Sequence, residues 1–73
     1  MLVKKSFSLA GHRTSVALEA EFWAVLGDLA ASEGLSLAGL VTRLDGARAP
    51  ERPLASALRV TALAAARDFP AKP

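Results

Sequence analysis

The chain contains no cysteine, no tyrosine and only one histidine among its 73 residues. Without cysteine it can form neither a disulfide nor a thiolate metal site, which fits a reducing compartment. One histidine and seven scattered acids are also a poor ligand set for zinc, so we expect no metal and no cofactor. Acid–base catalysis needs two titratable groups in one pocket, and this composition offers few. His12 is better interpreted as a residue at the end of a strand, and an enzyme is the least supported class.

Long apolar runs are missing as well. No apolar run approaches about 18 residues, and no charged segment leads into an apolar one near the start, so we expect neither a transmembrane helix nor a signal peptide. A soluble, cytoplasmic protein is the expectation. The length allows one domain at most, near the size where a single core barely suffices, and oligomerisation would relieve that shortage.

Charge is distributed unevenly along the chain, although the net charge is only +2. Residues 1–18 carry three bases and no acid, residues 19–34 carry four acids and no base, and the remainder is again basic. The basic N-terminal end could meet a polyanion, or it could be ordinary solvated surface. Composition alone leaves both interpretations open.

The segment 12–18, His-Arg-Thr-Ser-Val-Ala-Leu, has the clearest pattern. Its residues alternate, which places Val16 and Leu18 on one side of an extended chain and Arg13, Ser15 and Ala17 on the other. This pattern predicts one half-buried β-strand. A lone strand leaves its backbone groups unpaired, so we expect its partner to come from a second copy of the chain.

Residues 1–11 carry a weaker alternation that stops at Gly11. They are predicted to form an N-terminal arm, with a short extension of the strand as the alternative. Lys4 and Lys5 in such an arm could reach a phosphate backbone, or they could simply solubilise a frayed terminus.

Two helices are predicted next, each from apolar residues at positions i, i+3, i+4 and i+7. The first spans 20–33 and ends at Gly34, which can adopt a positive φ. The second spans 37–46 and is capped by Ser36. Their apolar residues are Phe22, Val25, Leu26 and Leu29 in the first, and Leu37, Leu40, Val41 and Leu44 in the second. Trp23 points partly away from its stripe and is interpreted as a core-edge or dimer contact, with partner recognition as the alternative.

A loop over 47–53 contains two prolines and separates these helices from a third, predicted over 54–68. The third helix is apolar on two faces, which indicates burial both in the subunit and in a dimer. One face comprises Leu54, Leu58, Thr61, Ala62 and Ala65, and the other Val60, Leu63 and Ala64. Pro70 and Pro73 mark a short tail.

The order of strand, helix, Gly-x-Ser turn and helix resembles the ribbon-helix-helix (Arc/MetJ-type) DNA-binding family. The run His-Arg-Thr-Ser-x-x-Leu-Glu from residue 12, with Gly34-Leu35-Ser36-Leu37 and the segment 54–60, is similar to a small bacterial subfamily with an extra C-terminal helix. The resemblance implies a mainly α fold with one β-strand. It also implies an intertwined homodimer whose two strands form an antiparallel ribbon that enters the major groove of DNA.

The same resemblance assigns roles to individual residues. Arg13, Ser15 and Ala17 would face base edges, and Ser36 with the amides of Leu37 and Ala38 would bind backbone phosphate at a helix N-terminus. A plain N-cap is the alternative role for Ser36, and one residue can serve both roles. Relatives often have a basic residue where this chain has Ala17. A ribbon that reads DNA bases usually carries three longer polar side chains.

A second functional class stays open. Small proteins of this fold also act as antitoxins, which bind a toxin through a C-terminal segment, or as dimers that regulate a protein partner without reading DNA. The apolar third helix is expected to pack on its own dimer, which disfavours an antitoxin that binds its toxin through this segment. Ala17, a short apolar residue on the face expected to read bases, is the feature that supports a dimer that regulates a protein without reading DNA. We therefore expect a dimeric DNA-binding protein that acts as a transcriptional regulator and reads the major groove with its β-ribbon, with a protein-interaction module as the alternative.

Overall fold

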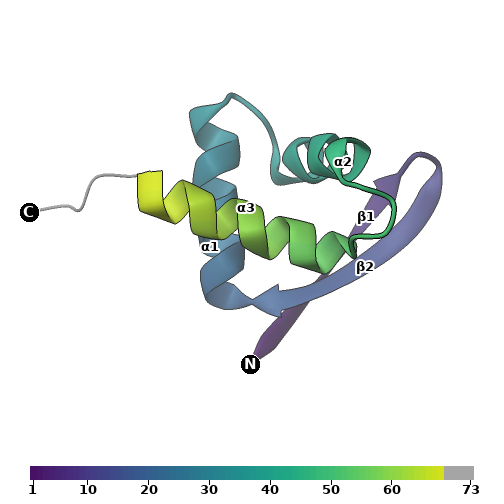
Figure 1. The fold of residues 1–73 in the computed structure, drawn as a ribbon, viewed down its shortest axis with the longest axis horizontal. Coiled ribbons are helices and arrows are strands. Elements are labelled where there is room, and N and C mark those ends of the chain that lie inside the picture. The colour runs from purple at the N-terminus through teal and green to yellow at the C-terminus, as the bar shows by residue number, and fades with distance from the viewer. Residues whose placement is uncertain (69–73) are drawn as a thin grey trace, which may run out of the picture.

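The computed structural model describes residues 1–68 and contains two strands and three helices. The elements follow the chain in the order β1 (Leu2–Leu9), β2 (His12–Glu19), α1 (Ala20–Ser32), α2 (Leu37–Ala47) and α3 (Leu54–Asp68). β1 and β2 form one antiparallel hairpin, and the three helices gather on one side of it (Figure 1). The tail containing Pro70 and Pro73 lies outside the described residues.

The expectation of one strand and an N-terminal arm over 1–11 is wrong, because β1 supplies β2 with a partner from the same chain. Two consecutive residues with positive φ make the reversal, Ala10 at 50° and Gly11 at 83°. Positive φ at both central residues is the geometry of a type I′ hairpin turn, whose usual sequence is Asn-Gly. Ala-Gly is a weak form of that signal, which explains why the hairpin was not predicted.

The three predicted helices correspond to α1, α2 and α3 with small differences at their ends. α1 ends in a tight turn in which Gly34 has φ +70°, the N–H of Leu35 donates to the Ala30 carbonyl, and the N–H of Gly34 donates to that of Ala31. This is the Schellman arrangement that a glycine after a helix favours. At the start of α2 the Ser36 hydroxyl accepts from the Gly39 N–H at 3.0 Å, as expected of an N-cap.

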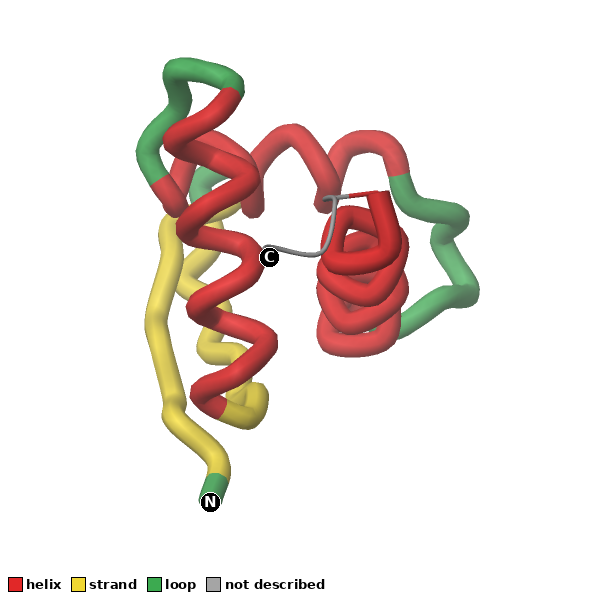
Figure 2. Tube along the Cα trace, turned by 90° about the vertical axis from the view of Figure 1, so that its left-hand side faces the viewer, coloured by secondary structure: helices red, strands yellow, loops and turns green. Residues whose placement is uncertain are grey.

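The core lies between the inner face of the hairpin and the helices. In the view of Figure 2 the strands run side by side along α1, and α3 is seen nearly end-on. Fully buried side chains come from every helix and from β2: Leu18, Leu26, Leu40, Val41 and Leu58. The described side chains leave no buried polar atom without a partner.

Trp23 belongs to this core and is buried more deeply than the core-edge position expected for it. It is 6% exposed, its ring centroid lies 5.9 Å from that of Phe7, and its indole N–H donates to the Val3 carbonyl at 2.8 Å. β1 therefore covers a side of α1 that the helix pattern alone left open. Of the expected stripe, Leu26 is fully buried, whereas Phe22, Val25 and Leu29 are half-buried against the core.

α3 buries the first of its two apolar faces, with Leu58, Ala62 and Ala65 in the core. On the second face Val60 and Leu63 are 51% and 57% exposed in the single chain. Among residues 1–68 no single helix is long and apolar enough to cross a membrane; α1 and α2 meet the length and composition only as a pair bent by 96°.

Candidate nucleic-acid interface

The outward face of β2 carries the residues expected to read bases. Val16 and Leu18 are buried toward the helices, whereas Arg13 and Ser15 are exposed and Ala17 is half-buried on the other side. Because side chains alternate along a strand, burial of the first pair fixes the direction of the other three. The structure thus brings Arg13, Ser15 and Ala17 to one face.

β1 adds three residues to this face that sequence reasoning did not place there. Residues directly opposite each other in an antiparallel pair share a face. The register sets Lys4 opposite Ala17, Ser6 opposite Ser15, and Ser8 opposite Arg13. The Oγ atoms of Ser6 and Ser15 lie 2.9 Å apart, which agrees with that register.

The two N-terminal lysines therefore point in opposite directions. Lys4 lies on the outward face, whereas Lys5 is opposite the buried Val16 and its Nζ lies 5.8 Å from the centroid of the Trp23 ring. That distance fits a cation–π contact. Lys5 is thus not brought together with Arg13, although composition and position along the chain made both lysines equal candidates for phosphate contacts.

The acid at the end of the outward face is already paired. Glu19 Oε1 accepts from Nε and Nη2 of Arg59 on α3, at 3.2 and 3.1 Å. The pKa of Glu19 is lowered, first by a backbone hydrogen bond to its carboxylate and second by the bond from Arg59. Since residues 1–18 contain no acid, the only carboxylate of the hairpin is held by a helix. The face keeps the positive charge of Lys4 and Arg13.

The second expected phosphate site, at the start of α2, is a separate feature. Ser36 acts as the cap, and its carbonyl accepts from the Leu40 N–H. The N–H groups of Leu37 and Ala38 make no backbone hydrogen bond in the described chain, as is usual in the first turn of a helix. This end belongs to α2 and not to the two strands.

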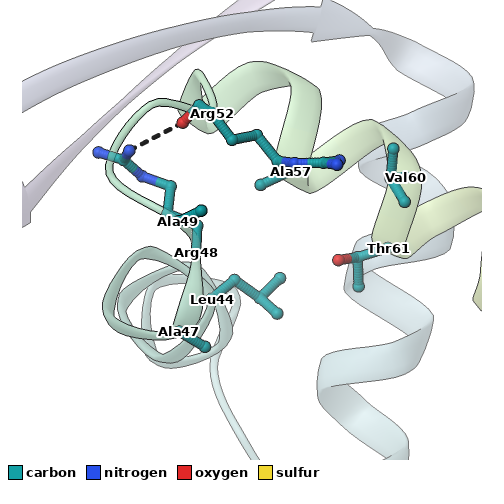
Figure 3. Close-up of a pocket in the computed structure, with 8 residues that line it drawn as sticks. All are labelled: Leu44, Ala47, Arg48, Ala49, Arg52, Ala57, Val60 and Thr61. Carbon is teal, nitrogen blue, oxygen red and sulfur yellow. Dashed lines mark hydrogen bonds between the residues drawn. The ribbon is translucent and has the colours of Figure 1, made fainter.

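A shallow pocket between α2 and α3 offers a different surface. Its volume is about 280 Å³, and its lining includes Leu44, Val60 and Thr61 (Figure 3). Arg48 in the lining is engaged, with Nε bonded to Asp45 at 3.0 Å and Nη1 donating to the Arg52 carbonyl at 2.8 Å. No catalytic pair of titratable groups lines it, and residues 1–68 hold no cluster of three potential metal ligands.

A ribbon with a cationic outward face, followed by two helices joined at a tight glycine turn, defines a ribbon-helix-helix domain. The chain belongs to this family: the model of the ribbon-helix-helix domain matches residues 2–66. Comparisons with curated proteins and with solved structures returned no match. Members of the family are commonly DNA-binding transcription regulators or antitoxins, they typically form dimers, and they are typically not enzymes.

Proposed function

We propose that this protein is a dimeric DNA-binding protein that regulates transcription by placing its β-ribbon in the major groove. The observation that carries the proposal is the outward face of the hairpin, where Lys4 and Arg13 lie among serines and the only acid of the two strands, Glu19, is paired with Arg59. A β-ribbon fits the major groove, and a cationic face without free acids suits a polyanion.

Each outward residue of β2 has a defined role in this proposal. Arg13 presents a guanidinium that can bind guanine through two hydrogen bonds, and Ser15 can donate or accept at several bases. Ala17 offers an apolar contact, such as one to a thymine methyl group. Ser36 and the free amides of Leu37 and Ala38 would hold a backbone phosphate, where the helix dipole favours negative charge.

The proposed dimer forms through the second edge of β2. One edge of β2 pairs with β1, and within residues 1–68 the other edge has no strand beside it. Antiparallel pairing of this edge with the same edge of a second copy would create the central ribbon, flanked on each side by β1. The proposed location is the cytoplasm, where a bacterial regulator meets its DNA.

Replacement of Arg13 by alanine tests the DNA-reading role. We expect Arg13→Ala to weaken binding to the preferred sequence by roughly 1–3 kcal/mol per contact and to relax specificity at one base position in each half-site. Arg67→Ala is the matched control, because it removes the same charge from an exposed position on α3. The preferred sequence is first selected from a random DNA pool, and sedimentation confirms that each variant has the same oligomeric state.

Unchanged affinity and sequence preference in a dimeric Arg13→Ala variant would contradict this proposal. The second candidate, a protein-interaction module such as an antitoxin or a regulator of a protein partner, would then lead. It is favoured by the exposed Val60 and Leu63 on α3. A gel shift on random DNA at increasing salt separates the two, because phosphate contacts make DNA binding strongly salt-dependent.

A further inference from the structure

We propose that the DNA-binding surface uses both strands of each hairpin. In this arrangement Lys4 on β1 supplies a cation directly opposite position 17 of β2, where this chain has the uncharged Ala17. This inference rests on the proposed function and deepens it. It makes Lys4 a contact for a DNA phosphate and excludes Lys5 from that role.

The register places Lys4 where it can serve this purpose. Lys4 and Ala17 are direct partners, and Cβ atoms of such partners lie about 4.5–5.5 Å apart on one face. The methyl group of Ala17 is too short to crowd the residue opposite it, so the long flexible side chain of lysine is free to extend toward a phosphate. Lys4 is exposed and forms no ion pair within the part of the chain that the structure describes.

The neighbouring acid strengthens this assignment. Glu19 is opposite Leu2 and therefore lies diagonally next to Lys4 on the same face, within reach of a long side chain. It would be the natural partner of Lys4, but its Oε1 atom is held by Nε and Nη2 of Arg59. Arg59 thereby acts as a positioning residue that keeps the Lys4 ammonium available to an external anion.

Lys4 is assigned to a phosphate and not to a base because of the width of the ribbon. Neighbouring strands lie about 4.8 Å apart, and the major groove is about 12 Å wide. Two central β2 strands fill such a groove, so each flanking β1 strand lies above a wall of the groove, where the phosphates are. Lysine binds phosphate as a point charge, whereas the planar fork of Arg13 suits a base edge.

The experiment compares Lys4→Ala, Lys5→Ala and the double variant Lys4→Ala/Ala17→Lys, with binding to the selected duplex and to random-sequence duplex DNA measured over a range of salt. Lys4→Ala should weaken binding to both duplexes by the same factor. The slope of log K against log salt should fall by about 0.9 unit for each lysine lost, so that the loss of affinity between 50 and 200 mM salt becomes roughly 3.5-fold smaller per lysine.

The double variant should recover the wild-type slope, because it moves the ammonium to the partner position on the same face. Lys5→Ala should keep the wild-type slope. Arg59→Gln, which frees Glu19, should lower the slope in the same direction as Lys4→Ala. Circular dichroism verifies that every variant is folded.

Two results would overturn the inference, and they differ. If wild type and Arg67→Ala bind the duplexes, Arg13→Ala loses sequence preference, and Lys4→Ala keeps the wild-type slope, then Lys4 is not a contact while the proposed function stands. If the wild-type protein shows no salt-dependent binding to either duplex, the proposed function and the inference fail together.

Discussion

Replacing Val16 with aspartate should prevent the chain from folding, because this side chain is only 5% exposed on the inner face of β2. The substitution removes a buried valine, which loses about 1.5–3 kcal/mol of stabilisation. It also leaves an unpaired buried charge, which destabilises the fold by about 3–5 kcal/mol more. A domain of 73 residues has a total free energy of unfolding of about 4–11 kcal/mol. The loss is therefore comparable to the whole stability.

Thermal melts followed by circular dichroism measure this effect, and Val16→Asp should show no cooperative transition. Two neighbouring variants are matched controls. Ser15→Ala should leave the fold intact, and Ala17→Asp should also remain folded while losing DNA binding, since it places the same charge on the outward face beside Lys4. If Val16→Asp melts like Ser15→Ala, the inward and outward faces of the hairpin have been assigned incorrectly.

Three further predictions concern other contacts. Trp23→Phe should lower the free energy of unfolding by about 0.5–1.5 kcal/mol, because it removes the hydrogen bond to the Val3 carbonyl. Urea unfolding should show this as a lower midpoint with an unchanged m-value, and an unchanged midpoint would contradict the prediction. Arg59→Gln should raise the pKa of Glu19 in an NMR titration, although the backbone hydrogen bond should still hold it below its ordinary value. Because the folded pKa is lowered, the stabilisation from Glu19 is present above its unfolded pKa and is lost as the pH falls through the folded value, so the variant should depend less on pH in that acidic range. Ala10→Asn should stabilise the hairpin turn by about 1 kcal/mol and Gly11→Ala should destabilise it, since both positions have positive φ; melting temperatures that move the other way would refute the turn geometry.

The helices could be predicted from the sequence because their signals are local. Apolar spacing, the Ser36 cap and the glycine after α1 each act within one or two turns, and the structure shows the corresponding helices and caps. The inward direction of Val16 and Leu18 followed in the same way from simple alternation.

The hairpin could not be predicted from local signals, because the contacts that stabilise it join residues that are distant in sequence. Phe7 and Leu9 are buried only when β1 packs against the helices, and Trp23 holds β1 through a bond to Val3, 20 positions earlier. The alternation of Phe7 and Leu9 was the available signal, and Ala-Gly was too weak a turn signature to support it. Because β1 was not predicted, the opposite directions of Lys4 and Lys5 could not be predicted either. Those directions depend on the register of the two strands and not on composition.

The contact of Trp23 with β1 also gives the protein a natural optical probe. It is the only tryptophan in the chain, and its ring lies 5.9 Å from the ring of Phe7 and 5.8 Å from Nζ of Lys5, both of which belong to β1. Its fluorescence should therefore respond to the docking of the N-terminal strand, whereas far-ultraviolet dichroism responds mainly to the three helices. Recording both signals during unfolding would show whether the strand detaches before the helices melt, without adding any label to the surface proposed to meet DNA.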